Sequence, residues 1–124
     1  MKIKFIANPK SGREVLGRIK IAEKLLKESG AEVITCITEK KGDAETWARE
    51  AISDRVDRIV VAGGDGTINE VINGVAASEY FSGAIPVGIV PLGISNVLAL
   101  ELGIPINIDK ACRVALEGDV KGVT

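Results

Sequence analysis

The chain contains no histidine, few aromatic residues and two cysteines. The absence of histidine excludes imidazole acid–base catalysis and the common zinc sites within these 124 residues. Aromatic residues make up 3% of a sequence that is 46% hydrophobic, so the core has to be built from Ile, Val, Leu and Ala. Aliphatic cores of this kind suit a sheet covered by helices, and the length suits one domain.

The small number of cysteines, the lack of long apolar runs and the low net charge bear on location and partners. Cys36 and Cys112 lie in apolar patterns, which favours buried free thiols in a reducing cytosol over a disulfide. No apolar run is long enough to span a membrane, and Met1 opens directly into a strand-like segment. We therefore expect no secretory leader and a cytoplasmic protein. The net charge of −1, from 16 basic and 17 acidic residues, predicts no nucleic-acid partner.

Strand-like and helix-like patterns alternate along the chain. Short β-branched runs predict strands at residues 3–7, 32–38, 58–62 and 86–90. Such alternation predicts a three-layer α/β fold, a mostly parallel sheet with helices on both faces. Ligands of these sheets bind beyond the carboxyl ends of the strands, where we expect three loops to meet. These loops are residues 8–12, 63–67 and 91–96.

The intervening segments have helical spacing. The first predicted helix is capped by Ser11 and stopped by Gly30, the second is capped by Asp43, and the third is capped by Thr67. Glu residues three positions after Ser11 and Thr67 complete two capping boxes. Two further helices are predicted at residues 95–102 and 109–118, and the start of a further strand at residues 119–124.

The most informative loop has the sequence GGDGT, at residues 63–67. Its glycines allow a sharp turn and a close approach of the backbone to a ligand, and a helix N-terminus follows. That combination is typical of a phosphate site. Asp65 would repel an anion, so its presence indicates that a cation is also bound or that a proton is moved there. A structural role for Asp65, bonding nearby backbone N–H groups, stays open.

Three motifs occur in order: NPKSG at 8–12, GGDGTINEVING at 63–74 and PLGISN at 91–96. Together they resemble the catalytic domain of the diacylglycerol kinase family, which includes sphingosine kinases and bacterial lipid kinases. The resemblance implies the Rossmann-like fold of that family and of NAD kinases. In the third motif Ile94 stands where the family usually has Thr, and Val97 follows Asn96 where the family often has Asp.

The resemblance implies ATP-dependent phosphorylation of a lipid hydroxyl with Mg²⁺, and Asp65 as the catalytic residue. No metal ligand set is assigned. Ser11, Thr67 and Glu70 are also explained as helix caps, and the two roles are compatible. The expected nucleotide-binding residues are Asn8, Pro9, Lys10, Ser11, Gly12, Thr38, Gly63, Gly64, Asp65, Gly66, Thr67, Asn69 and Glu70.

The family resemblance also implies a second, β-rich domain after residue 124, so we expect residues 1–124 to be the nucleotide-binding half and to be inactive alone. Peripheral membrane contact and homodimer formation stay open. Two other functions stay open: an NAD kinase-like small-molecule kinase, and a non-catalytic nucleotide-binding module.

Overall fold

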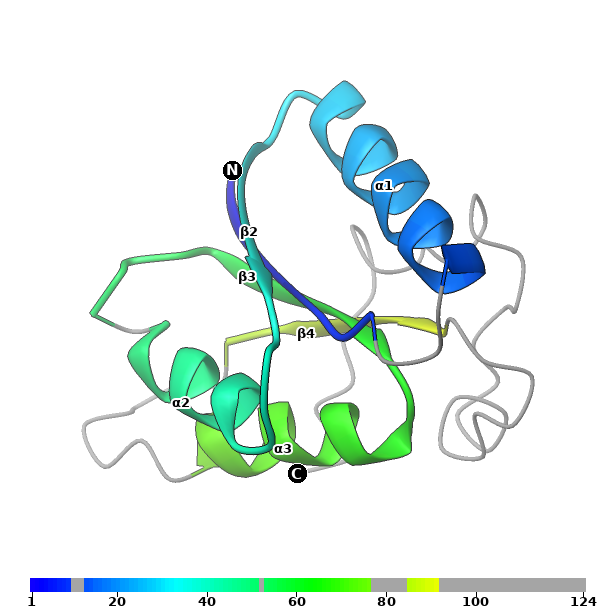
Figure 1. Ribbon diagram of the computed structural model, residues 1–124. Coiled ribbons are helices and arrows are strands. Elements are labelled where there is room, and N and C mark those ends of the chain that lie inside the picture. The colour runs from blue at the N-terminus through cyan, green and yellow to red at the C-terminus, as the bar shows by residue number, and fades with distance from the viewer. Residues whose placement is uncertain (10–12, 52, 77–84, 92–124) are drawn as a thin grey trace.

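Strands and helices alternate as the sequence predicts. The computed structural model describes residues 1–9, 13–51, 53–76 and 85–91 (Figure 1). The strands are β1 (Lys2–Ala7), β2 (Glu32–Ile37), β3 (Arg58–Gly63) and β4 (Val87–Pro91). The helices are α1 (Arg13–Glu28), α2 (Asp43–Glu50) and α3 (Asp65–Ala76). The elements predicted after residue 94 lie outside the described residues.

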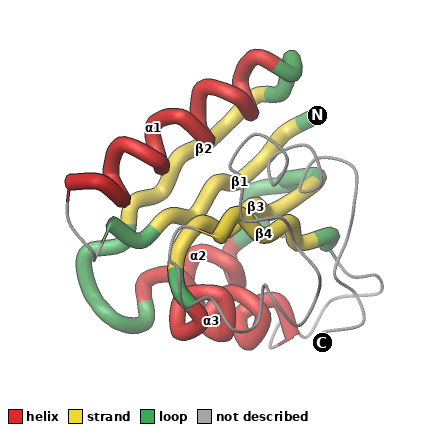
Figure 2. Tube along the Cα trace, turned by 90° about the vertical axis from the view of Figure 1, so that its right-hand side faces the viewer, coloured by secondary structure: helices red, strands yellow, loops and turns green. Residues whose placement is uncertain are grey.

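The four strands form one parallel sheet in the order β2-β1-β3-β4. The chain therefore moves from β1 outward to β2, crosses back to β3 on the other side of β1, and continues to β4. Because such crossovers are right-handed, this reversal places α1 on one face and α2 and α3 on the other, as Figures 1 and 2 show. The three-layer α/β prediction is confirmed.

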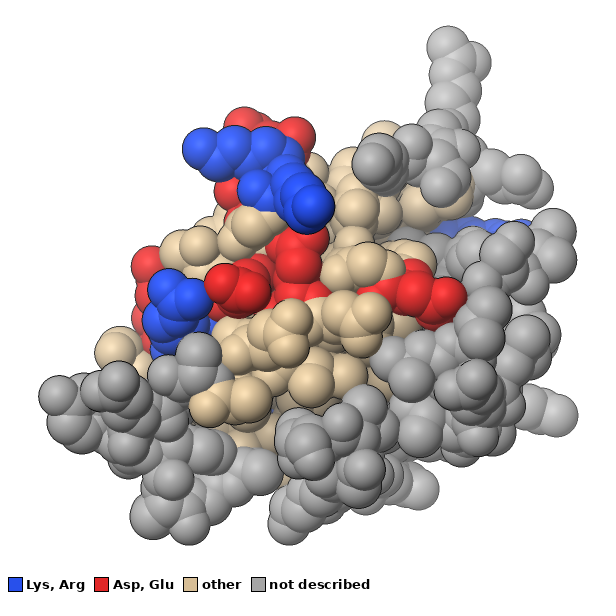
Figure 3. Space-filling view, turned by 90° about the horizontal axis from the view of Figure 1, so that it is seen from below, with Lys and Arg blue, Asp and Glu red and all other residues tan. Residues whose placement is uncertain are grey.

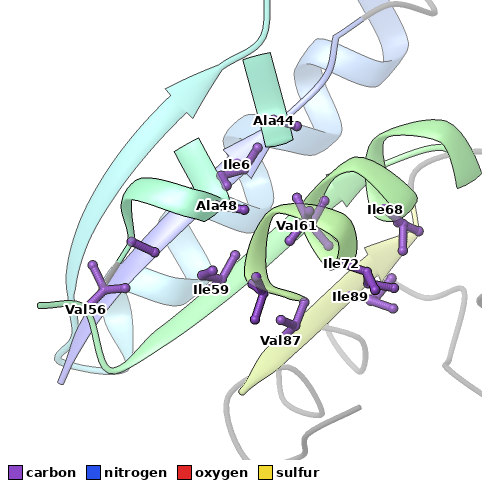
Figure 4. Close-up of a cluster of buried hydrophobic side chains, with 13 residues drawn as sticks. Ile6, Ala44, Ala48, Val56, Ile59, Val61, Ile68, Ile72, Val87 and Ile89 are labelled. Atoms are coloured by element: carbon purple, nitrogen blue, oxygen red, sulfur yellow. The ribbon is translucent and has the colours of Figure 1, made fainter. Parts of the chain in front are cut away.

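Each face of the sheet carries its own hydrophobic cluster, because successive strand residues point to opposite faces. In β1, Ile3 and Phe5 belong to the cluster under α1, whereas Ile6 belongs to the cluster under α2 and α3. In the second cluster, Ile6, Val61 and Ile89 of the sheet lie against the two helices (Figure 4). Phe5 is the largest fully buried side chain of the described residues, and the remaining core is aliphatic.

Helices α2 and α3 approach each other very closely at Gly74. A Cβ atom at this position would lie 2.4 Å from the carbonyl oxygen of Glu45 and 2.8 Å from Cβ of Ala48. Real Cβ atoms do not make such contacts, so the glycine is what permits this helix separation. The close packing brings the start of α2 beside α3, which matters for the site described below.

On the central strand β1, a buried lysine is held by an aspartate. Lys4 of β1 is 3% exposed, and its Nζ lies 2.5 Å from Oδ2 of Asp54. The free thiol of Cys36 is half-buried on neighbouring β2, and burial is the main cause of its raised pKa. The thiol predicted to be buried is thus only partly buried, because β2 is an edge strand, and Cys112 lies outside the described residues. No helix among the described residues combines the length and hydrophobicity needed to cross a bilayer.

Candidate functional site

An open cleft of about 730 Å³ lies at the carboxyl ends of β1, β2 and β3. This is where the strand order reverses, because the helices that follow β1 and β3 lie on opposite faces of the sheet. Crevices at such switch points are the usual ligand sites of open α/β sheets. The lining residues are Asn8, Pro9, Thr38, Glu39, Lys40, Lys41, Ala44, Gly64, Gly66, Thr67 and Glu70.

The glycine loop enters its helix earlier than predicted. α3 begins at Asp65, and the N–H of Ile68 donates to the carbonyl oxygen of Gly64 at 3.1 Å. Thr67 is therefore inside the first turn of α3, and the predicted capping box of Thr67 and Glu70 is wrong. The reason is that Gly64 already occupies the position before the helix, so both side chains are available for contacts with other segments.

Thr67 joins the two loops that flank the switch point. The residue is 5% exposed, and its Oγ1 accepts a hydrogen bond from Nδ2 of Asn8 at 2.9 Å. The backbone N–H of Asn8 donates to the carbonyl oxygen of Ala62, also at 2.9 Å. A Cβ atom on Gly63 would lie 3.0 Å from Cβ of Thr67, so Gly63 makes room for that side chain. The first glycine of the loop thus serves packing.

Glu70 reaches a different loop. Its Oε1 accepts the backbone N–H of Gly42 at 2.9 Å, which links α3 to the segment between β2 and α2. Gly42 has φ of 96° and precedes the first residue of α2, so it takes the cap position that was predicted for Asp43. That prediction is wrong by one residue, because the left-handed backbone at Gly42 turns the chain into the helix there.

Asp43 makes hydrogen bonds within the segment between β2 and α2. Its Oδ2 accepts the backbone N–H groups of Glu39 at 2.9 Å and of Lys40 at 3.0 Å. These hydrogen bonds lower the pKa of the Asp43 carboxyl, because they stabilise its ionised form. At the start of the segment, the N–H of Thr38 donates to the carbonyl oxygen of Ala7 at 2.8 Å. The segment 38–43 is thus bonded at both ends and internally.

The predicted site residues fall into three groups. Of those in the described part of the chain, Asn8, Pro9, Thr38, Gly64, Gly66, Thr67 and Glu70 line the cleft. Gly63, Asp65 and Asn69 do not: Gly63 is buried in β3, Asp65 is half-buried at the first position of α3, and Asn69 is exposed. Lys10, Ser11 and Gly12, with most of the third motif, lie outside the described residues.

Sequence reasoning missed four lining residues: Glu39, Lys40, Lys41 and Ala44. A signal was present for the first three, because they directly follow Thr38 at the carboxyl end of a predicted strand. The two lysines add positive charge to a cleft that also contains the carboxylates of Glu39 and Glu70. Seen from the side of α2 and α3, described surface residues of both signs share one face, so it is no continuous basic patch (Figure 3).

The oxygen chemistry of the cleft suits a hard cation. Mg²⁺ usually binds one or two carboxylates and takes its other ligands from water and phosphate. Glu39 and Glu70 line the cleft, and Asp65 lies between the lining residues Gly64 and Gly66. Across the part of the chain that the structure describes, no group of three or more His, Cys, Asp or Glu side chains could hold a metal by itself.

Comparison with known proteins identifies the family. A sequence model of the diacylglycerol kinase catalytic domain matches residues 2–124. The chain belongs to this family. A diacylglycerol kinase from Staphylococcus carnosus (strain TM300) is 36% identical over 119 residues, which are 94% of this chain and 38% of that protein. A probable lipid kinase, YegS-like, from Citrobacter koseri is 39% identical over 100 residues, 80% of this chain and 33% of the relative.

A solved diacylglycerol kinase structure agrees with this assignment. The crystal structure from Bacillus anthracis str. Sterne superimposes with a TM-score of 0.71 and 31% sequence identity. The match covers 91% of this chain and 40% of that one. The resemblance to the diacylglycerol kinase family and the fold it implied are both confirmed. The chain spans two fifths or less of the length of these diacylglycerol and lipid kinase relatives.

Proposed function

We propose that this chain provides the ATP-binding part of a kinase that phosphorylates a lipid hydroxyl of the diacylglycerol type. The observation that carries the proposal is the cleft at the switch point, lined by Gly64 and Gly66 at the start of α3. It supports a phosphate ligand because helix N-termini direct N–H groups and the positive end of the helix dipole outward. Membership of the diacylglycerol kinase family supports the reaction.

The triphosphate of ATP would lie along the start of α3. Gly66 has no atom within 4 Å of the position of a Cβ, so a ligand can approach its backbone. Lys40 and Lys41 would add positive charge from the other side of the cleft, and Asn8 and Thr67 would add polar contacts. Phosphoryl transfer depends mainly on positioning and on stabilising negative charge on the phosphate oxygens, which these groups would do.

Asp65 is the residue that we propose for the chemical step. Its carboxylate would hold Mg²⁺ or accept the proton that the lipid hydroxyl loses when its oxygen attacks the terminal phosphorus. Bound Mg²⁺ would supply neutralisation of the phosphate charge. A second, β-rich domain, with the lipid cleft and further acid–base groups, stays a prediction. Peripheral membrane contact also stays a prediction.

Transfer of labelled phosphate tests the function. The full-length protein is incubated with radiolabelled ATP and Mg²⁺, with diacylglycerol in mixed micelles or with NAD as acceptor. We expect labelled lipid, and loss of labelling in Asp65→Asn but not in Glu28→Gln, a matched change on the exposed end of α1. Labelled NAD without labelled lipid would favour an NAD kinase, and ATP binding without transfer would favour a non-catalytic module.

A further inference from the structure

Glu70 presents a chemical problem if the cleft holds a triphosphate. It lines the cleft and was expected to contact the nucleotide, but a carboxylate repels phosphate. Its observed partner is instead a backbone N–H group, that of Gly42, at 2.9 Å. Gly42 is 28 residues away in the sequence and belongs to the segment that forms the opposite wall of the cleft.

We propose that Glu70 is a positioning residue, which acts through Gly42 to hold segment 38–43 against α3 and thereby sets the distance of Lys40 and Lys41 from the nucleotide. The inference rests on the proposed function for the identity of the ligand. It rests on the structure for the contact itself. Glu70 is fixed on α3, the helix whose first turn lines the cleft, so the contact relates the two walls directly.

Gly42 is well suited to transmit this restraint. Its carbonyl oxygen accepts two hydrogen bonds from Thr46, one from the backbone N–H and one from the side-chain hydroxyl, each at 3.1 Å. The residue is thus tied to the first turn of α2. Its φ of 96° is accessible to glycine without strain. With its N–H donated to Glu70, both backbone polar groups of Gly42 are engaged. Movement of the segment would therefore break the contact with Glu70 or distort the start of α2.

Asp43 couples the rest of segment 38–43 to Gly42, so that the segment moves with this glycine. Its carboxylate accepts the N–H groups of Glu39 and Lys40, which fold the segment back on the helix start. The side chains of Lys40 and Lys41 are exposed and line the cleft. The close packing of α2 and α3 at Gly74 acts in the same direction one turn further along α3. Glu70 thus controls the positions of the Lys40 and Lys41 side chains without touching the ligand.

The test separates hydrogen bonding from charge. Glu70→Gln keeps an oxygen that can accept the Gly42 N–H but removes the negative charge, whereas Glu70→Ala removes both. In the full-length protein without nucleotide, hydrogen exchange of the Gly42 amide is measured by NMR. We expect faster exchange in Glu70→Ala and protection close to wild type in Glu70→Gln. Glu45→Gln and Glu45→Ala, which alter an exposed glutamate paired with Arg49 on α2, serve as controls.

Nucleotide titration gives the second readout. We expect the KM for ATP to rise by about tenfold in Glu70→Ala, as for loss of one charge-assisted hydrogen bond, with kcat changed less. Glu70→Gln should restore most of the affinity. Equal Gly42 exchange in wild type and Glu70→Ala would overturn the proposal. So would a Gln variant as impaired as the Ala variant with its Gly42 amide still protected, because the charge would then act directly, for example on Mg²⁺.

The two proposals fail differently. A wild-type protein that binds no ATP would refute the proposed function. The Gly42 exchange rates would still show whether Glu70 anchors the segment. Conversely, normal lipid phosphorylation in Glu70→Ala would leave the proposed function intact and overturn the positioning role.

Discussion

Nδ2 of Asn8 lies 2.9 Å from Oγ1 of Thr67, so the residue that directly follows β1 is hydrogen-bonded to the first turn of α3. These two segments belong to different motifs, separated by 59 residues. They also leave the sheet toward opposite faces. The contact therefore fixes the geometry of the cleft at the place where the chain reverses its direction of winding.

Asn8→Ala should weaken both stability and ligand binding. We expect the free energy of unfolding to fall by about 1 kcal/mol, the usual net value of one hydrogen bond. Affinity for ATP should fall by about tenfold, since Asn8 lines the cleft and aligns its neighbours. Urea denaturation and calorimetric titration measure the two effects. The control is Asn73→Ala, an exposed asparagine further along α3; equal behaviour of the two variants would contradict the prediction.

Gly74→Ala should separate α2 from α3. The added Cβ would collide with the backbone oxygen of Glu45, so we expect a loss of about 1–3 kcal/mol in the free energy of unfolding, typical of overpacking. Gly17→Ala is the matched control, because Gly17 lies on the exposed face of α1 with no atom within 4 Å of its Cβ position. That change should stabilise the protein by about 0.5–1 kcal/mol. Thermal denaturation of both variants decides the question.

The pairing of Lys4 with Asp54 predicts an asymmetry between two variants. Asp54→Ala leaves a buried ammonium without its carboxylate, and because the Asp54 side chain is 41% exposed we expect a reduced cost of about 1–2 kcal/mol. Lys4→Met, which fills similar volume without charge, should be neutral within about 1 kcal/mol or stabilising. Denaturant titration of both single variants and the double variant gives the coupling energy. A loss in Lys4→Met as large as that in Asp54→Ala would argue against this account.

Acid should release segment 38–43 through Asp43. The folded-state pKa of this carboxyl is lowered by its hydrogen bonds to the N–H groups of Glu39 and Lys40. Its contribution to stability is therefore complete above the unfolded value, about 3.9, and is lost as the pH falls through the lowered folded value. NMR titration of the Asp43 side chain, with exchange of the Glu39 and Lys40 amides, measures this. In Asp43→Asn, which keeps an acceptor oxygen, the transition should disappear.

Much of the fold follows from local patterns. The β-branched runs predicted all four described strands. The run in β3 is apolar because that strand is buried on both faces, whereas the edge strand β2 is only partly buried. Boundaries moved by a residue where pairing extends the strand: β3 reaches Gly63 because that residue pairs with Pro91 of β4. The stop of α1 at Gly30 was also predictable, and the residue has the positive φ, 92°, that favours glycine.

The roles of side chains in the site were less predictable. Thr67 and Glu70 have the spacing of a capping box, but the helix starts at Asp65 and both side chains bond to distant segments. Local spacing cannot reveal this, because the partners are Asn8 and Gly42. Lys40 and Lys41 lie outside the three sequence motifs. They line the cleft because the sheet places the end of β2 beside the end of β1.

The central position of β1 has a consequence for biosynthesis. Its residue Ile3 pairs with Val33 on one side and Arg58 on the other, so β1, which is translated before both neighbours, acquires the second of them only after β3 has been translated. Until then one side of β1 exposes unpaired backbone groups, which can recruit strands from other nascent chains. Slowing translation between β2 and β3 should therefore increase aggregation during synthesis.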